Sequence, residues 1–380
     1  MGKSITGGRV QSLLKEAALV TWLPWLLARV AVTLALIASK FEVAHFTPLN
    51  SKAVELSRNG LLGYDAGWYQ SIAANGYEGS GYSSERFYPL FPLLIKSLHL
   101  LTPFGWSFIT VVLANAMAFV AGMALYLLVK IDLKDTLLAR RSVWLLCLAP
   151  ISFSLVFGYA ESMLLVFAIL TLLFLRRKAW WWAGLFGLLA ATTRPLGLLL
   201  VAPALIEVVQ SRKELSRRRV FAGAAAVLGP IIGTLSYLTW VAIAFGDFWA
   251  PIKIQQLPLH HGPFTNPLVV LYHAVFNLFH GHHIGTALHL PWICLAIVLI
   301  VVAFRRLPLS YAVFSLAIVL VALSGSNLDS FERYVLSAFP LIIVAAGWLR
   351  AKNTAVVVLS ASAVVMSGYA FLTFQGLYVP

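Results

Sequence analysis

Residues 18–39 read ALVTWLPWLLARVAVTLALIAS, an apolar run of 22 residues that contains one charged side chain. An α-helix needs about 20 mainly apolar residues to cross the hydrocarbon core of a bilayer. The run follows a basic leader with Lys3, Arg9 and Lys15. It is longer than the roughly 7 to 15 apolar residues of a signal peptide, and no clear cleavage site of small residues follows it. We therefore expect a first membrane-spanning helix that is retained.

Apolar runs of this kind recur along all 380 residues. The chain is 60% hydrophobic and 11% charged, with a mean hydropathy of +0.86, whereas soluble domains average roughly a quarter charged residues. Lipid is therefore the expected solvent for most of the chain. Cys147 and Cys294 both fall inside apolar runs, where a free cysteine behaves as a small hydrophobe. The sequence predicts neither a disulfide framework nor a cysteine metal site.

The net charge of +14 would suggest nucleic acid in a soluble protein, but the basic residues are grouped at alternate helix junctions. This is the pattern of the positive-inside rule, in which Lys and Arg gather in cytoplasmic loops. We therefore predict contact with bilayer lipid and no nucleic-acid partner. The clusters are Lys3/Arg9/Lys15, Lys130/Lys134/Arg140/Arg141, Arg176/Arg177/Lys178, Arg212/Lys213/Arg217/Arg218/Arg219, Arg305/Arg306 and Arg350/Lys352.

With these clusters in the cytoplasm, the sequence predicts an all-α polytopic membrane protein of one domain, residues 1–380. About eleven helices are expected, with the N-terminus inside and the C-terminus outside. They lie near residues 18–39, 105–129, 142–158, 160–175, 180–194, 195–210, 220–245, 291–304, 308–324, 334–349 and 354–373. Two outer segments, residues 40–103 and 246–290, are longer than a turn requires, and loops of that length are usually functional or structured.

The first outer segment shows helical patterning at residues 65–74 and again at 87–101, which predicts short interfacial helices. It is also rich in aromatic side chains, among them Tyr64, Trp68 and Tyr88. Such rings suit the headgroup level of a membrane, so an aromatic belt is an alternative to a binding function for them.

Nine of the fourteen acidic residues fall on the predicted outer side, which the positive-inside rule does not explain. These nine are Glu42, Glu55, Asp65, Glu78, Glu85, Glu161, Asp247, Asp329 and Glu332, against Glu16, Asp132, Asp135, Glu207 and Glu214 inside. Asp65 has no basic residue within six positions. An uncompensated carboxylate among aromatic rings is expected to have a raised pKa, which suits a general base.

Three arginines on the outer side need an explanation because ions at the membrane edge are costly. Arg194 and Arg333 are candidates for a lipid phosphate, since the planar guanidinium binds phosphate oxygens in pairs. Structural ion pairs or snorkelling side chains are the alternative. Arg86 is expected to pair with a neighbouring acid. Glu85 and Glu332, each adjacent to an arginine, are expected to partner those arginines.

The second outer segment holds seven of the nine histidines, but no acid or cysteine occurs between Phe248 and Leu290. Zinc sites usually combine paired histidines with an acid or a thiolate, so no metal is predicted. Contact with sugar hydroxyls or an acceptor phosphate, or plain interfacial polarity, remain open for these side chains. They are His260, His261, His273, His280, His282, His283 and His289.

Several stretches resemble the PIG-V-like mannosyltransferases of the GT-C class, and they occur in that family's order. The first is YDAGWYQSIAANGY at residues 64–77, followed by ERFYPLFPLL at 85–94. The others are FGYAESMLLVFAILTLLFL at 157–175, ATTRPLGLLL at 191–200, FGDFWAPIKIQQ at 245–256 and RYVLSAFPLI at 333–342. Tyr64, where tryptophan is common, and Glu85-Arg86 before FYP resemble prokaryotic members.

The resemblance implies a transferase that moves mannose from a polyprenyl-phosphate carrier to a lipid-linked or membrane-presented acceptor on the outer side. Asp65 matches the family's first-loop acid, so it would be the base of an inverting displacement, with Arg333 and Arg194 holding the phosphate. No cofactor or metal is implied, because the donor has no nucleotide diphosphate. The other expected substrate-binding residues are Tyr64, Trp68, Glu85, Arg86, Tyr88, Glu161, Asp247, Gln255, Gln256, His260 and His261.

Two alternatives stay open. A transporter or flippase of a lipid-linked saccharide would also use arginines and aromatics at the membrane edge, although the internal repeats that transporters often show are not visible. A related transferase could use another polyprenyl-phosphate sugar, such as arabinose or glucose. The sequence does not identify the acceptor.

Overall fold

The computed structural model describes residues 7–48, 51–212, 217–280 and 289–379, and within these ranges it is almost entirely helical. Lys3, Lys213, Glu214, His282 and His283 lie outside the described residues. Among those described, the only β contact is an isolated antiparallel bridge between Phe264 and Gly325. The elements are α1 Gly7–Phe46, α2 Lys52–Asn59, η1 Gly60–Leu62, α3 Asp65–Ser80, η2 Tyr82–Arg86, α4 Leu90–Leu101, α5 Trp106–Leu128, η3 Val129–Leu133, α6 Thr136–Leu148, η4 Pro150–Leu155, α7 Glu161–Arg176, α8 Trp180–Thr193, η5 Pro195–Leu200, α9 Val201–Gln210, α10 Arg217–Phe245, α11 Ala250–Gln255, α12 Pro267–His280, α14 Leu290–Arg306, α15 Leu309–Ala322, α16 Phe331–Ser337, α17 Pro340–Ala346 and α18 Lys352–Phe374.

In the described ranges, four helices are long and apolar enough to cross a membrane. They are α1, α5 with its continuation η3, α10 and α18. The prediction of an all-helical membrane protein is confirmed, and α1 contains the predicted first span within a longer helix of 40 residues. The remaining apolar helices are shorter, so the predicted total of eleven spans stays a prediction.

Prolines divide two of the predicted spans. The helix expected at 142–158 ends with α6 at Leu148 and continues as the 3₁₀ segment η4 from Pro150. The helix expected at 334–349 is split into α16 and α17, the second of which begins at Pro340. Proline has no amide hydrogen and disfavours helical backbone at the preceding residue, so an apolar run continues while the α-helix stops.

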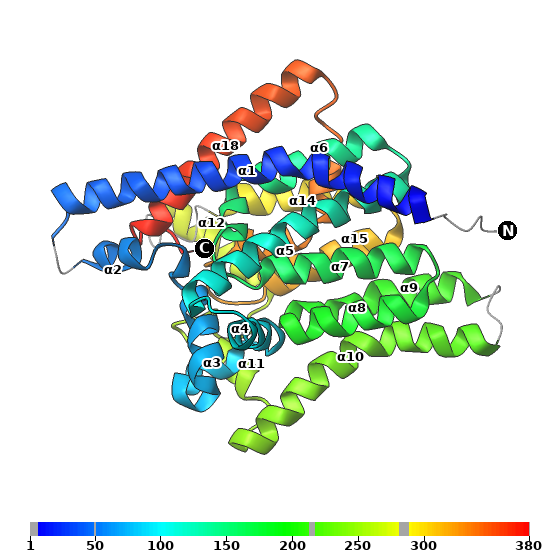
Figure 1. Cartoon of the computed structure of the whole chain (residues 1–380), viewed down its shortest axis with the longest axis horizontal. Helices are drawn as coiled ribbons and strands as arrows, with labels where there is room; N and C mark the ends of the chain where they lie inside the picture. Colours follow the sequence, from blue (N-terminus) through cyan, green and yellow to red (C-terminus); the bar gives the residue numbers. More distant parts are fainter. Residues whose placement is uncertain (1–6, 49–50, 213–216, 281–288, 380) are drawn as a thin grey trace.

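α7 and α8 lie side by side with nearly parallel axes, whereas α5 runs obliquely to them and α18 is steeply inclined (Figure 1). α10 packs most extensively on α8. The two helices are in close contact at Gly184 and Gly229, where a Cβ on Gly229 would lie 2.1 Å from the carbonyl oxygen of Gly184. Small residues of this kind let helices approach closely in lipid, where the hydrophobic effect does not drive them together.

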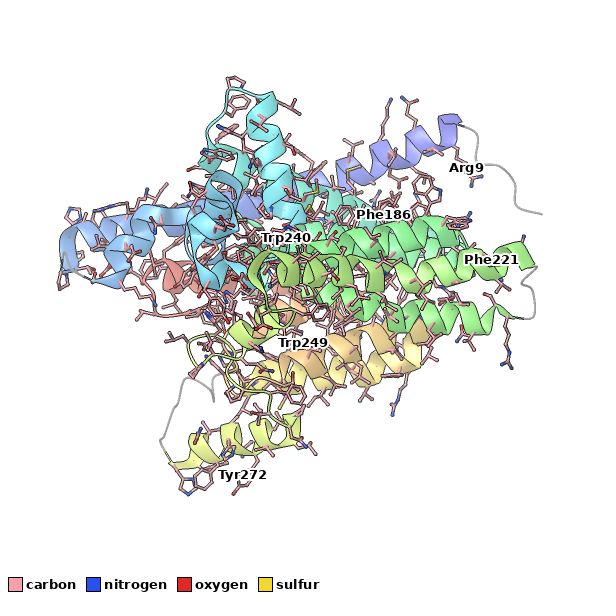
Figure 2. All side chains as sticks on the ribbon, turned by 90° about the horizontal axis from the view of Figure 1, so that it is seen from below. Arg9, Phe186, Phe221, Trp240, Trp249 and Tyr272 are labelled. Carbon is pink, nitrogen blue, oxygen red and sulfur yellow. The ribbon has the colours of Figure 1, made fainter. Side chains whose placement is uncertain are left out.

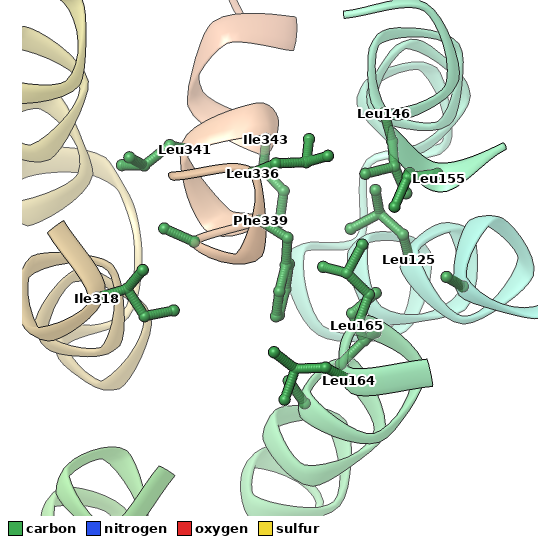
Figure 3. Close-up of a cluster of buried hydrophobic side chains, with 14 of the residues drawn as sticks. Leu125, Leu146, Leu155, Leu164, Leu165, Ile318, Leu336, Phe339, Leu341 and Ile343 are labelled. Carbon is green, nitrogen blue, oxygen red and sulfur yellow. The ribbon is translucent and has the colours of Figure 1, made fainter. Parts of the chain in front are cut away.

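Buried side chains at the centre of the bundle join helices that are distant in sequence. Figure 3 shows Leu125 of α5 and Leu164 of α7 facing Leu336 and Phe339, which come from α16 and the break after it. All four are buried. This packing holds α16 against the N-terminal half of α7.

A buried ionic cluster ties the C-terminal end of α7 to three other segments. Arg176 donates to Asp132 of η3 at 3.0 Å and to Glu207 of α9 at 3.2 Å. From α15, Ser310 donates to Glu207 at 2.6 Å and Tyr311 donates to Asp132 at 2.8 Å. Because α7 has 16 residues, this cluster lies roughly 24 Å from the helix start at 1.5 Å per residue.

The first outer segment contains α2, α3 and α4, so the helices predicted at 65–74 and 87–101 are confirmed, the first of them extending to Ser80. The second outer segment contains α11 and α12. In Figure 2, α12 with its exposed Tyr272 stands apart from the rest of the bundle.

Candidate functional site

Asp65 is the first residue of α3, and an unusual backbone conformation places it there. The preceding residue, Tyr64, has φ 54°, a value that costs a residue with a side chain of order 1–3 kcal/mol. Its hydroxyl donates to the carbonyl oxygens of Thr373 at 3.0 Å and Tyr378 at 3.2 Å. The C-terminal segment therefore fixes the turn that aims Asp65.

Gly158 brings the start of α3 close to the start of α7. Its amide donates to the carbonyl of Leu61 at 3.0 Å. A Cβ at Gly158 would lie 2.8 Å from Thr110 and 3.2 Å from Ala66, the residue after Asp65. A side chain here would push the two segments apart, so glycine permits the contact that places Asp65 near Glu161.

Arg333 and Arg194 reach the same place from the other half of the chain. Arg333 lies in α16, three residues after Ser330, whose φ is 65°. Its guanidinium donates to Asp65 Oδ2 at 2.7 Å, and its Nε lies 3.3 Å from Glu161 Oε1. Arg194 follows the last residue of α8 in an extended conformation before Pro195, and it also donates to Glu161. Glu161 thus bridges two arginines.

Arg86 completes the group. Its Nη2 lies 3.8 Å from Asp65 Oδ1, and its guanidinium stacks over the ring of Phe87 at 4.6 Å. The buried Nε of Arg86 has no hydrogen-bond partner among the described residues. A buried donor without a partner is costly in a finished fold, so this atom has unused capacity for a hydrogen bond.

Three guanidinium groups and two carboxylates therefore meet at one place. Burial raises the pKa of Asp65, but Arg333, Arg86 and Arg194 outweigh it and hold that pKa below its ordinary value. The raised pKa expected from the sequence is wrong. The reason is that the compensating charges come from residues far along the chain.

Asp65 and the three arginines line a pocket of about 530 Å³. One wall is polar and the other is built from apolar residues of η5, α10 and the second outer segment. Several apolar lining residues, including Leu235 and Phe264, are also exposed on the outside of the molecule. The pocket therefore joins a cationic end to a surface of the kind that faces lipid. Its polar lining residues include Asp65, Arg86, Arg194, Gln255, Gln256, His261, Arg333 and Tyr334.

Tyr334 connects the second outer segment to the arginines. Nε2 of His261 lies 2.6 Å from its hydroxyl, and the Gln255 amide donates to it at 3.4 Å. Burial and the nearby Arg333 lower the pKa of His261 to about 4, so this imidazole is neutral near pH 7. Sequence reasoning missed Tyr334, although it follows Arg333 in one of the quoted stretches. With His261 neutral, the site has one net positive charge.

The sequence profile described as glycosyltransferase family 87 matches residues 87–326, which is more than half of the chain. The chain belongs to glycosyltransferase family 87. No curated protein matches the sequence significantly. Among solved structures, this family 87 glycosyltransferase resembles ArnT from Cupriavidus metallidurans, solved bound to undecaprenyl phosphate. The two share 15% identity and a TM-score of 0.50 over 83% of this chain and 72% of ArnT, which shows the same GT-C membrane fold.

Eight of the predicted site residues line the pocket of this family 87 glycosyltransferase. Trp68 instead stacks on Phe87, which lines the pocket. Tyr64 fixes the turn before Asp65, and Glu161 contacts Arg194 and Arg333. His260 contributes its carbonyl oxygen to Asn327, which fixes the second outer segment beside the pocket. The eight lining residues are Asp65, Arg86, Tyr88, Arg194, Gln255, Gln256, His261 and Arg333.

The two predicted pairings of Glu332 and Glu85 with adjacent arginines are wrong. Glu332 does not pair with Arg333: it contacts His289 at 2.6 Å and accepts from Tyr378 at 2.8 Å. No ion pair joins Glu85 to Arg86 in the described ranges, and burial raises the pKa of Glu85. Asp247 pairs with Lys253 at 2.7 Å, and its part in substrate binding stays a prediction.

The histidines of the second outer segment are dispersed where the structure describes them. His273 and His280 lie on α12, and His289 pairs with Glu332. In the described residues, no group of three histidines, cysteines or acids is placed to hold a metal ion. Since His282 and His283 are outside those residues, metal-independent chemistry stays a prediction.

Proposed function

We propose that this family 87 glycosyltransferase transfers mannose from polyprenyl-phosphate mannose to a lipid-linked or membrane-presented acceptor on the extracytoplasmic side. The observation that carries the proposal is the pocket that combines three arginines and Asp65 with an exposed apolar wall. A polyprenyl phosphate has the matching parts, an anionic phosphate and a long hydrocarbon chain. ArnT, which shares the fold, is solved bound to undecaprenyl phosphate.

The charge of the site supports a donor with one phosphodiester. Such a group carries one negative charge, which balances the single net positive charge of the site. In an inverting displacement, the acceptor oxygen bonds to the anomeric carbon while the bond from that carbon to the phosphate oxygen breaks. The acceptor proton passes to Asp65, and the leaving phosphate takes the electron pair and a second negative charge. Neutralising Asp65 gives the site a second net positive charge at the same moment, so the balance is kept.

The arginines would act as preorganised cations that stabilise the leaving phosphate. Arg333 and Arg86 are the nearest to Asp65, at 2.7 and 3.8 Å. Arg194 is held by Glu161 and lines the same pocket. No second carboxylic acid is required, because a phosphate leaves without being protonated.

The choice of mannose as the transferred sugar is supported by the resemblance of the quoted stretches to PIG-V-like mannosyltransferases. The placement of the pocket on the extracytoplasmic side is supported by the positive-inside rule. Arg176 and the basic end of α7 would then face the cytoplasm, and the pocket beside Glu161 would face outward. The donor must accordingly be a lipid, since nucleotide sugars are expected in the cytoplasm.

The test is to incubate the purified protein with polyprenyl-phosphate mannose and a membrane extract and to search for a product heavier by one hexose. Parallel reactions with polyprenyl-phosphate arabinose and glucose identify the sugar. If only the arabinose or only the glucose donor gave a product, that sugar would replace mannose in the proposal, and the protein would still be a transferase. Passage of intact donor across proteoliposomes without sugar transfer would support a flippase instead. Loss of activity with EDTA that a divalent ion restores would contradict a metal-independent reaction.

A further inference from the structure

A second and larger groove lies between α1, α6 and α18, away from the pocket that contains Asp65. Its volume is about 1270 Å³, and its walls are mainly apolar side chains such as Leu34, Trp144 and Val356. Leu34 and Val356 are 60% and 57% exposed, so this groove opens on the outside of the bundle. In Figure 1, the N-terminal end of α18 lies farther from α1 than its C-terminal end does, on the side where the groove opens.

Four basic residues line one end of this groove: Arg140, Arg141, Arg350 and Lys352. No acidic residue lines it. Arg141 donates to the carbonyl of Arg350 at 2.5 Å, and none of the four forms an ion pair within the described residues. The charge of Glu16 interacts with that of Arg140, but Glu16 forms its ion pair with Lys130. The groove therefore ends in four cations with no acid among its lining residues.

The groove is long enough to hold acyl chains. On α6 the lining residues run from Leu137 to Leu148, which spans roughly 16 Å of helix. On α18 they run from Lys352 to Phe371, which spans roughly 28 Å. A phospholipid whose headgroup contacts the four cations would therefore find apolar side chains along α18 for the full depth of its leaflet, which is about half of a 30 Å hydrocarbon core.

From the four cations at one end and the apolar walls beside them, we infer that the groove binds an anionic phospholipid of the leaflet that adjoins the basic end. The phosphate lies among Arg140, Arg350 and Lys352, and the acyl chains lie along α6 and α18. Basic pockets between helices are recognised sites for anionic headgroups. The groove shares no lining residue with the pocket proposed for the donor, so the two sites are distinct. The lipid site does not depend on the identity of the sugar.

Native mass spectrometry of the full-length protein tests this inference, with phosphatidylglycerol and phosphatidylcholine of identical acyl chains as probes. The wild type is expected to retain phosphatidylglycerol at least tenfold more tightly. A triple variant, Arg140→Ala, Arg350→Ala and Lys352→Ala, is expected to lose that preference, while Arg141 still donates to the backbone carbonyl of residue 350. The matched control is Arg305→Ala with Arg306→Ala, a basic pair at the end of α14 outside the groove.

A steric variant tests the acyl part separately. Ser360→Phe adds bulk at an exposed residue that lines the groove, and Ala361→Phe adds it at the next residue, which is exposed but outside it. The inference requires that Ser360→Phe weakens the binding of phosphatidylglycerol and that Ala361→Phe does not. Equal losses in the triple variant and the Arg305/Arg306 control would overturn it. Displacement of phosphatidylglycerol by a lower concentration of undecaprenyl phosphate would overturn the choice of occupant.

Discussion

Replacing Asp65 by asparagine separates its proposed role as a base from a role in building the site. Asparagine has nearly the same shape but cannot accept the acceptor proton. It also leaves Arg333 without the carboxylate that now lies 2.7 Å away. We therefore expect Asp65→Asn to lose turnover while binding the donor as well as the wild type, or better.

The two magnitudes can be estimated independently. Removing a positioned general base lowers the rate of the chemical step by about 10² to 10⁴. For the donor, two unit charges 4 Å apart attract by about 4 kcal/mol at an effective dielectric constant of 20. Desolvation cancels most of such an attraction. The phosphate no longer competes with Asp65 for Arg333, so we expect a gain near 1.4 kcal/mol, or tenfold in affinity.

The assay measures single-turnover transfer from polyprenyl-phosphate mannose and, separately, the equilibrium binding of an unreactive polyprenyl phosphate. Melting temperature in the same detergent shows whether the variant is folded. Glu78→Asn is a suitable control, because Glu78 is exposed on the same helix and outside the pocket. Full transfer by a folded Asp65→Asn protein would refute the base. Equal losses of binding and turnover would show that Asp65 organises the arginines rather than accepting the proton.

Three further results are expected. Between about pH 5 and 8, kcat/KM should show no acidic limb from Asp65, because its arginine partners keep its pKa below the ordinary 3.8. The Asp65 carboxylate contributes stability above its ordinary pKa, and this stability is lost as the pH falls through the lowered pKa of the folded protein. Melting temperatures measured as a function of pH check the sign of this effect. Glu161→Gln, which leaves Arg194 and Arg333 buried together, should lower the free energy of unfolding by about 3–5 kcal/mol, whereas Glu78→Gln should not change it. Tyr311→Phe removes the hydroxyl that donates to Asp132 and should cost about 1–2 kcal/mol in a denaturation experiment without changing transfer.

The apolar runs predicted the membrane class and the long helices because hydropathy is a local property. α1, α5, α10 and α18 need no distant partner to be recognised. Hydropathy does not indicate where an α-helix stops inside an apolar run. The predicted helices therefore did not include the breaks before Pro150 and Pro340. The structured first outer segment was also predictable, since α3 and α4 follow local patterning.

The site was predictable in its residue types but not in its pairings. Asp65 and Arg333 are 268 positions apart, so a search for basic residues near Asp65 in sequence could not detect the ion pair that lowers its pKa. Glu332 and Arg333 are adjacent, but consecutive side chains on a helix project about 100° apart and do not face each other. Glu332 therefore contacts His289 and Tyr378 while Arg333 contacts Asp65.

The pairing of Asp65 with Arg333 has a consequence for the order of events. A carboxylate that accepts a hydrogen bond from an arginine at 2.7 Å is a weak base. A donor phosphate that takes over Arg333 and Arg86 would leave Asp65 with less positive charge around it and so raise its basicity. Glu161 would meanwhile keep Arg194 and Arg333 in place from behind. Activation of the acceptor would then follow donor binding, which keeps the base inactive until there is a sugar to transfer.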